Sequence, residues 1–400
     1  MQKYLFVFFL ILYFIPVSGQ EKEKKDRSWT LNGYVKDMAN YTFVGEDEQW
    51  DNLIHNRLNF KWYPHQNIKI IAEMRNRAFF NSQFQDSLFN NTDSSFIHFR
   101  EGVFIPSLDD ADDFFDLSYT YDAEDVVFHF MLDRLYFQYN KGNFEGKIGR
   151  QRINWGINTV WNPNDIFNAF SFFDFDYEER PGSDALVLRL YTGVASSIEI
   201  AGKFADSMEV FTGAAMWKTN IKKYDFQLLA GLSNMNLVVG GGWAGNINKA
   251  GFKGEGSYFI PLEDAQDSTE VFSATASLDY SFKSSLYLMG SILYSSNGSI
   301  SPSIKEQVNY YTGNISAKYL SPYRYSVFLQ ASYQFHPLIN GGAGVIGYPG
   351  SYDAFVGPMI TFSILQSLDL DFFAQVLFAE VNEVYKATTQ AYYLRLKFSF

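Results

Sequence analysis

The stretch that decides the fold class is LIHNRLNFKWYPHQNIKIIAEMRNRAF, residues 53–79. Apolar and polar side chains alternate one by one on both sides of its Pro-His-Gln-Asn turn, and this is the period of a β-strand. In the first arm Ile54 and Phe60 share one face, whereas Arg57 and Lys61 share the other. The second arm repeats the pattern with another set of cations. The stretch therefore predicts an antiparallel hairpin with one apolar and one charged face.

The same alternation recurs along most of the chain. It is clearest in DALVLRLY (184–191), YRYSVFLQASYQF (323–335), LDLDFFAQVLF (368–378) and YYLRLKFSF (392–400). Short turns alternate with long polar segments, as they do in outer-membrane barrels, and we expect about eighteen strands, or roughly sixteen as the alternative count. The expected strand starts lie near residues 28, 53, 67, 127, 143, 184, 196, 208, 222, 236, 249, 270, 285, 308, 323, 353, 369 and 390.

Composition separates a membrane barrel from other all-β folds. The chain is 18% aromatic with a mean hydropathy of −0.16, and beyond residue 20 no apolar run reaches the roughly 20 residues that a membrane-spanning helix needs. A soluble sandwich is disfavoured because the apolar faces are lined with aromatics while the opposite faces carry Arg, Lys and Gln. A propeller would show a repeat of roughly 40–50 residues, and none is visible. Because an open sheet edge is untenable in lipid, we predict one transmembrane antiparallel up-and-down β-barrel domain, residues 28–400.

The first residues indicate export. Lys3, the apolar run at residues 5–15 and the small residue Gly19 are arranged as in a cleaved secretory signal, so residues 1–19 are expected to be removed. An uncleaved anchor is the alternative. Residues 20–27 would form a short periplasmic lead. The chain has no cysteine, which excludes disulfides and a lipid anchor after the leader. The predicted location is the outer membrane of a Gram-negative bacterium.

Charge and motif content narrow the function. A net charge of −12 argues against nucleic acid as a partner, because phosphate binding needs a basic surface. The five histidines are scattered without metal-ligand spacing, and no G-x-S-x-G motif occurs. We therefore predict no enzyme activity, no cofactor and no metal site. Two alternatives stay open: a barrel enzyme whose site is assembled in space, and a non-conducting surface or assembly barrel.

The most unusual segment is IGRQRINWGINTVWNPNDIFNAFSFFDFDYEERPGSDALVLRL, residues 148–190. Its strand pattern stops near residue 153 and resumes near residue 184, and Pro163 and Pro181 exclude a central strand between them. Aromatic side chains such as Trp155 need something to pack against, and the barrel interior can supply it. We therefore predict a constriction loop, residues 153–183, that folds into the lumen. The charged side chains that it would present to the passage are Asp165, Asp174, Asp176, Glu178, Glu179 and Arg180.

Side-chain parity predicts which charges line the lumen if the apolar faces meet lipid. The inward cations of the early strands and the closing strand would adjoin as a basic wall: Arg57, Lys61, Lys69, Arg75, Arg77, Arg395 and Lys397. Arg134 and Arg189 are expected inward on the same grounds, as candidates for the constriction. Facing acidic loops, such a wall would sieve ions by charge. The alternative is that these cations pair with lumen carboxylates such as Glu73, Asp133 and Glu145 and only hydrate the interior.

Two stretches resemble known families. YYLRLKFSF, ending at Phe400, resembles the C-terminal assembly signal of Gram-negative outer-membrane barrels, which implies delivery to the barrel-assembly machinery. GRQRINWG followed by WNPND resembles outer-membrane porin-like proteins of the alginate-export and substrate-selective type, in a Bacteroidetes-like Gram-negative lineage. The resemblance implies a passive channel for small solutes with Arg150, Arg152 and the loop at its constriction.

That placement of the two arginines conflicts with parity. If Ile148 faces lipid, strict alternation places Arg150 and Arg152 outward as well, unless a β-bulge near Gly149 intervenes. The plainer alternative is that Arg150 and Trp155 only brace the loop. The other partners expected are outer-membrane lipid and lipopolysaccharide, and a homo-oligomer is an open alternative to a monomer.

Overall fold

The structure is a computed structural model of the 400-residue chain. It describes residues 28–45, 47–80, 114–123, 126–170, 180, 182–265, 267–303, 306–307, 310, 315–381 and 383–400. The predicted leader and periplasmic lead, residues 1–27, lie outside this range. No helix in the described part of the chain is long and apolar enough to cross a membrane.

Strands account for most of the described chain and form one antiparallel sheet. In chain order they are β1 (Trp29–Val44), β2 (Asp47–His65), β3 (Ile68–Phe80), β4 (Ser118–Ala123), β5 (Val126–Lys141), β6 (Phe144–Gln151), β7 (Ser183–Gly193), β8 (Ser196–Lys203), β9 (Thr212–Ile221), β10 (Tyr224–Ser233), β11 (Asn236–Ile247), β12 (Ala250–Pro261), β13 (Val271–Ser281), β14 (Leu286–Ser295), β15 (Tyr325–His336), β16 (Ile339–Gly347), β17 (Ala354–Leu365), β18 (Leu368–Val381) and β19 (Val384–Ser399).

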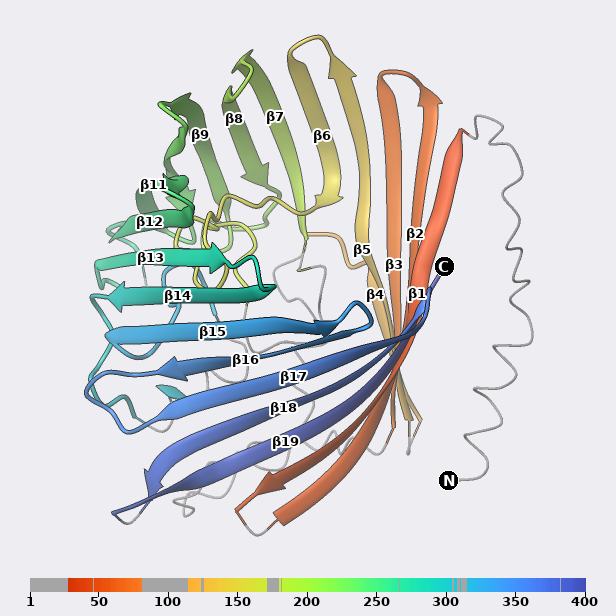
Figure 1. Ribbon diagram of the computed structural model, residues 1–400. Helices are drawn as coiled ribbons and strands as arrows, with labels where there is room; N and C mark the ends of the chain where they lie inside the picture. Colours follow the sequence, from red (N-terminus) through yellow and green to blue (C-terminus); the bar gives the residue numbers. More distant parts are fainter. Residues whose placement is uncertain are drawn as a thin grey trace.

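The sheet is closed because its first and last strands pair. β1 and β19 are antiparallel, with Tyr34 opposite Ser399 at one end of their ladder. Next to this pair, Phe400 and Gly33 each donate their N–H to the other's carbonyl oxygen at 3.0 Å. The other strands follow one another around the ring, which gives the predicted up-and-down barrel (Figure 1).

The predicted strand number is confirmed, and one short strand explains why the chain has an extra element. β4 pairs with Val126–Met131 of β5, and β6 pairs with Leu135–Lys141 on the same edge of β5. The opposite edge of β5 is occupied by β3 along most of its length. β4 and β6 therefore share one position in the ring, and the barrel is eighteen strands around.

The two faces of the sheet have the chemistry that parity predicted. Phe137, Ile148, Leu186 and Ile200 lie on the outer face of β5–β8, and each is at least 40% exposed. Neighbours of opposite parity, such as Ala201, are buried on the inside. An apolar exterior of this kind suits hydrocarbon, because strands in a barrel satisfy their backbone groups by pairing with each other.

The strand prediction differs from the structure at two places. The strand expected near residue 308 would begin outside the described residues, and the described residues nearest to it, 306–307, 310 and 315–322, are not in a strand. β16 was missed because its sequence, INGGAGVIG, lacks alternation. Its glycines make room for large neighbours: a Cβ on Gly344 would lie 2.9 Å from the ring of Phe328. Glycine within a strand often marks such a close approach.

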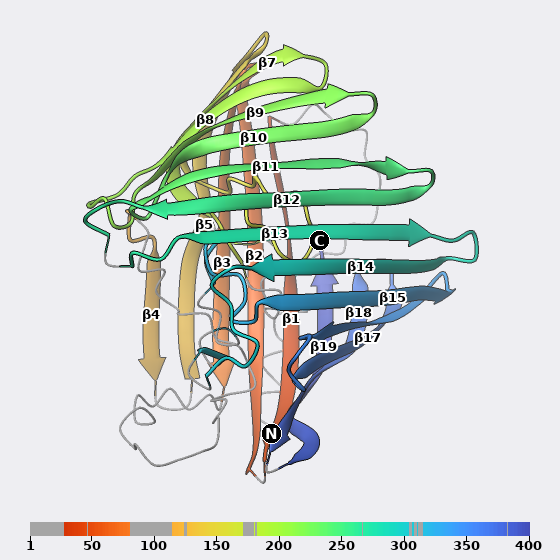
Figure 2. The same ribbon diagram turned by 90° about the vertical axis from the view of Figure 1, so that its left-hand side faces the viewer.

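The apolar core lies inside the barrel, where two loops fold against the wall. The constriction loop follows β6, and its side chains Trp155 and Phe167 pack on buried residues of β7–β13. The second loop follows β14, and its described residues Tyr310, Leu320 and Tyr323 pack with Trp161 against β14–β17. The predicted inward-folded loop is thus confirmed for its described residues. Figure 2 shows β9–β14 crossing in front of β1–β5, on the other side of the barrel.

The glycine packing in β16 can be tested. Replacing Gly344 by Ala pushes a Cβ against the buried Phe328 ring, and we expect the free energy of unfolding in detergent to fall by about 1–3 kcal/mol. Gly347→Ala on the same strand is the matched control, because no atom lies within 4 Å of its added Cβ. Urea unfolding of both variants measures the difference; equal stabilities would contradict this account of the glycine.

Candidate functional site

The constriction loop is anchored at Trp155. Its indole Nε1 donates to Glu199 Oε1 on β8 at 2.6 Å, and its carbonyl oxygen accepts from Gln227 Nε2 on β10 at 2.7 Å. The indole also packs edge-on against Phe167, with ring centroids 4.9 Å apart. The side chain is almost fully buried, and polar side chains of the wall satisfy both its indole N–H and the backbone carbonyl of the same residue.

The next residues of the loop are held by β12. The N–H groups of Ile157 and Asn158 both donate to Glu255 Oε1, at 3.1 and 2.9 Å. Ser257 Oγ donates to Asn164 Oδ1 at 2.7 Å. Loop backbone that leaves a strand still needs hydrogen-bond partners when it is buried, and these wall side chains supply them.

Glycines of β11 open the space for this contact. A Cβ on Gly242 would lie 2.6 Å from Ile157 Cδ1, and one on Gly240 would lie 2.7 Å from Asn164 Oδ1. The glycines of GGGWAG, residues 240–245, therefore leave a gap among the wall side chains, in which the loop approaches the strand backbone closely. This gap is called the β11 slot below.

The position of Asp165 differs from the prediction. It was predicted to face the passage, but it is fully buried between the loop and the wall. The N–H of Trp155 donates to its Oδ1 at 3.4 Å. Burial raises the pKa of Asp165 to about 7, although Arg152 attracts its charged form. Asp174, Asp176, Glu178 and Glu179, predicted beside it, lie outside the described residues.

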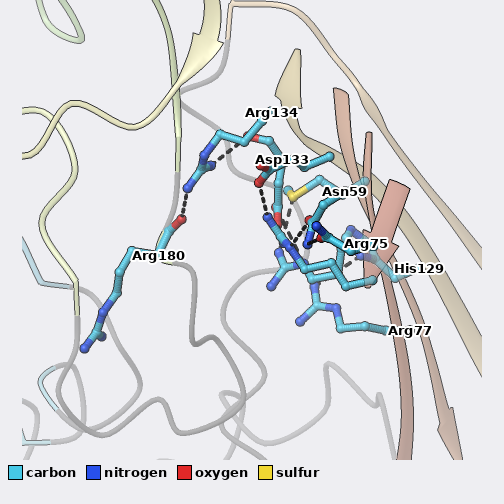
Figure 3. Close-up of polar contacts among 11 residues, drawn as sticks. Asn59, Arg75, Arg77, His129, Asp133, Arg134 and Arg180 are labelled. Atoms are coloured by element: carbon cyan, nitrogen blue, oxygen red, sulfur yellow. Dashed lines mark hydrogen bonds and ion pairs between the residues drawn. The ribbon is translucent and has the colours of Figure 1, made fainter. Parts of the chain in front are cut away.

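The two ends of the constriction loop meet at an aromatic ring. Arg180 stacks on Phe170 with its Cζ 3.4 Å from the ring centroid, and Arg152 lies 5.8 Å from the same ring. Arg134 Nη2 donates to the carbonyl oxygen of Arg180 at 2.6 Å, as Figure 3 shows. A bulge in β5 lets Asp133 and Arg134 both point inward, which is why a wall residue reaches the loop here.

All the predicted basic-wall residues lie on the inner parity of β2, β3 and β19, with β1 between β2 and β19. Arg57, Arg75 and Arg77 are buried, whereas Lys61, Lys69, Arg395 and Lys397 are less buried. The ladders bring basic side chains into one continuous cross-strand row of directly opposed residues: Lys397, Lys36, His55, Arg77 and His129. Directly opposed side chains are about 5 Å apart, so the row concentrates positive charge on one side of the interior.

Some of these cations are paired, as the alternative interpretation expected. Arg57 forms ion pairs with Asp133 and with Glu73, the latter at 2.8 Å. Arg75 Nε lies 3.6 Å from Asp133 Oδ1. Figure 3 shows Asp133 among these arginines and beside Arg134. A buried carboxylate is needed there, because closely spaced buried cations would otherwise repel one another.

Arg189, a predicted constriction residue, lies on the inner face of β7 at some distance along the strand from the loop ends. It pairs with Glu199 and, at 3.3 Å, with Glu145. Because Glu199 also accepts the hydrogen bond of the Trp155 indole, Arg189 helps to position the carboxylate that anchors the loop.

The structure places Arg150 elsewhere than at the predicted constriction. It pairs with Leu135 and Asp184 across its two neighbouring strands, on the parity of the exposed Ile148 and Leu186, so it lies on the outer face. Arg150 is nevertheless buried: Asp184 Oδ2 is 2.9 Å from its Nη2, and the same nitrogen donates to the carbonyl oxygen of Phe115. Gly149 adopts a φ of 115°, but the register is unbroken there.

The ion pair holds the segment that leads into β4. The N–H of Phe115 donates to Asp184 Oδ2 at 2.9 Å, so Arg150 and Asp184 together satisfy both backbone groups of that residue. Phe115 and its neighbour Phe114 remain exposed and pack near Phe204. Arg150 therefore clamps an outer segment and does not line the constriction.

Sequence reasoning missed the wall residues that hold the loop, Glu199, Gln227 and Glu255, and missed Lys36 and His129 in the basic row. Parity would have placed each of them on the inner face. It could not have shown which loop atoms they contact, because the contacts join segments up to 98 residues apart. Within the described residues, no three His, Cys, Asp or Glu side chains gather as a metal site would require.

The clamp can be tested by stability. Arg150→Leu leaves Asp184 buried without its cation, and we expect the free energy of unfolding to fall by about 3–5 kcal/mol. The double variant Arg150→Leu/Asp184→Leu should recover most of the loss, because no buried charge is left alone. Urea unfolding measures both. An unchanged stability in the single variant would show that the ion pair does not stabilise the segment that leads into β4.

The chain resembles known proteins in its fold and not in its sequence. No family model matches the chain, and no curated protein matches it by sequence. Three solved structures from Pseudomonas aeruginosa are similar: OccK11 (OpdR), with a TM-score of 0.56 and 8% identity over 93% of this chain and 96% of that one; OccK5 (OpdH), with 0.57 and 7% over 92% and 98%; and OccK8 (OprE), with 0.56 and 7% over 93% and 98%. At this identity the likeness establishes the fold. The structural neighbours are Gram-negative outer-membrane porins, so the chain shares their eighteen-stranded barrel.

Proposed function

We propose that the protein is an outer-membrane porin: a passive channel for small solutes that prefers anions. The observation that carries the proposal is the division of the barrel interior between a docked constriction loop and a basic wall on the opposite side. Each half follows from the register and contacts described above.

The two halves face each other across the ring. Counting β4 and β6 as one position, β1 is first and β11 is tenth of eighteen, so β11 and β12 lie half a turn from β1 and β2. The loop is seated on β11 and β12 through Gly242 and Glu255. The basic row crosses β1 and β2 through Lys36 and His55. Figure 1 shows β11 and β12 on the opposite side of the ring from β1 and β2. A solute in the lumen would therefore pass between the loop and the cations.

The size of the barrel supports a passage. Barrels of roughly 16–18 strands enclose more space than their own inward side chains can fill, and they leave an aqueous lumen. An inserted loop narrows such a lumen to the size of small solutes. This argument favours a channel over the alternative of a solid, non-conducting barrel.

The sign of the charge supports anion preference. The inner faces of β19, β1, β2 and β3 carry the basic row together with the remaining cations of the predicted wall. The carboxylates that face them are fewer than the Lys and Arg side chains: Asp51 and Glu73 on β2 and β3, Asp133 on β5, and Asp369 and Asp371 on β18. A low-dielectric passage lined by one sign of charge raises the local concentration of the opposite ion.

The location and partners belong to the same proposal. The predicted leader at residues 1–19 would export the chain, and the strand ending at Phe400 would present it to the barrel-assembly machinery. Outer-membrane lipid and lipopolysaccharide would contact the aromatic exterior. A kinship with alginate-export porins and a homo-oligomeric state stay predictions.

Deleting the loop tests the channel. Removal of residues 160–178 should enlarge the single-channel conductance in a planar bilayer, because it removes the loop segment that contains Trp161. Deletion of residues 205–210, a connection between β8 and β9, is the control and should leave the step size unchanged. A folded protein without conductance in any form would contradict the porin proposal and favour the enzyme or assembly alternatives.

Neutralising the accessible part of the basic wall tests selectivity. The triple variant Lys61→Gln/Lys69→Gln/Lys397→Gln should lower the anion-to-cation permeability ratio by at least about twofold. The control removes the same charge from exposed turns, as Lys141→Gln/Lys249→Gln/Lys283→Gln, and should change the ratio little. Reversal potentials in asymmetric salt give the ratios. Equal ratios in the two variants would refute a selective role for the wall.

A further inference from the structure

The seat of the constriction loop contains buried polar atoms without hydrogen-bond partners among the described residues. They are the acceptor oxygens Asn162 Oδ1, Asp165 Oδ2 and Glu255 Oε2 and the donor Asn158 Nδ2. Asn158, Asn162 and Asp165 belong to one short piece of the loop, and Glu255 contacts that piece from β12. Asp165 accepts from Trp155, a Cβ on Gly156 would lie 2.4 Å from Asn162 Oδ1, and Glu255 accepts from the next two residues.

A proton on Asp165 would resolve this arrangement. An ionised carboxylate only accepts hydrogen bonds, whereas a protonated one also donates. A hydroxyl at Asp165 Oδ2 would be a donor in a seat whose acceptors Asn162 Oδ1 and Glu255 Oε2 lack partners among the described residues. Burying a neutral carboxyl also costs less than burying an ionised one with an unpartnered oxygen.

The charges around Asp165 have opposing effects. Arg152 and Arg180, at the two loop ends, favour its ionised form, whereas Glu255 on β12 opposes it. The neighbouring wall strands add Glu199 on β8 and Lys218 on β9; Lys218 interacts with Glu199 and with Glu255. Burial outweighs the attraction of the arginines, and the pKa of Asp165 rises to about 7.

We propose that Asp165 is protonated while the constriction loop is docked, so that the seat of the loop is a proton-dependent latch that loosens as the pH rises. The ligand of this site is a proton, held where the loop meets the wall. The proposed channel supplies one readout for it, and the proton site can also be observed without conduction.

The direction follows from linkage. The pKa of Asp165 is raised from its ordinary 3.8 to about 7 in the docked loop. The stabilisation from proton binding is therefore complete below the ordinary pKa, and it is lost as the pH rises through about 7. The ratio of docked to undocked loop is therefore expected to fall at least about tenfold between pH 5.5 and pH 8.5.

The first readout is conductance between pH 5.5 and 8.5 for the refolded full chain. The wild type should show larger steps, or more time in its larger step, as the pH rises through about 7. Asp165→Asn should remove that change, because the neutral amide cannot release a proton. Asp264→Asn, in the loop after β12, is the matched control and should behave as the wild type does, because the Asp264 side chain is exposed. His55 and His129 are intact in every variant, so any pH dependence left in Asp165→Asn belongs to other groups.

The second readout is the infrared absorption of protonated carboxyl groups at pH 6. The band should be present in the wild type and in Asp264→Asn, smaller in Asp165→Asn, and should titrate at about pH 7. Glu255→Gln removes a neighbouring negative charge and should move that midpoint to lower pH, which keeps the test decisive if Asp165→Asn fails to refold.

The outcomes separate the two proposals. A titrating band without conductance in any variant would refute the channel and leave the proton site standing. Conductance in a protein whose infrared spectrum shows no such band would refute the latch alone. A wild type and an Asp165→Asn variant that respond equally to pH would refute it as well, and a response to added Ca²⁺ in place of pH would assign the acceptors to a cation.

Discussion

The structure depends on the requirement that every strand edge be paired. In lipid an unpaired N–H or C=O has no water to bind, so a sheet can cross the membrane only if its two edges join. Here β1 and β19 make that junction, down to the reciprocal hydrogen bonds of Phe400 and Gly33. Once the sheet is closed, each strand has an outer and an inner face, and a side chain's parity decides which environment it meets.

Closure at eighteen strands leaves an interior that the strands cannot fill by themselves. The chain fills part of it with two loops, and a loop buried in this way has backbone groups that need partners. Glu199, Gln227 and Glu255 serve as those partners, and Gly240 and Gly242 bring the loop within reach of them. The polar residues on this side of the wall are thus explained by the loop that they hold.

The opposite side of the wall is dominated by a different constraint, the mutual repulsion of cations. Arg57 and Arg75 share Asp133, which the bulge in β5 turns inward together with Arg134. Arg134 in turn holds the carbonyl oxygen of Arg180 at the end of the constriction loop. Arg134 therefore links the basic wall to the loop, and a structural change in one is expected to alter the position of the other.

The sequence by itself determined the barrel, its approximate strand number and the inner face of residues such as Arg57, Arg75 and Lys397, because parity is a local property with a period of two residues. It also indicated the inserted loop, since the aromatic side chains around Trp155 needed apolar surroundings. It did not reveal β16, whose glycines carry no alternation, and it misplaced Asp165 and Arg150. Both positions depend on partners distant in sequence. Glu255 and the β11 slot hold the loop segment that buries Asp165, and Asp184 with the Phe115 segment holds Arg150. Parity assigns a face, but only the register between strands decides which side chains meet there. The cation row and the seat of the loop are therefore properties of the tertiary structure.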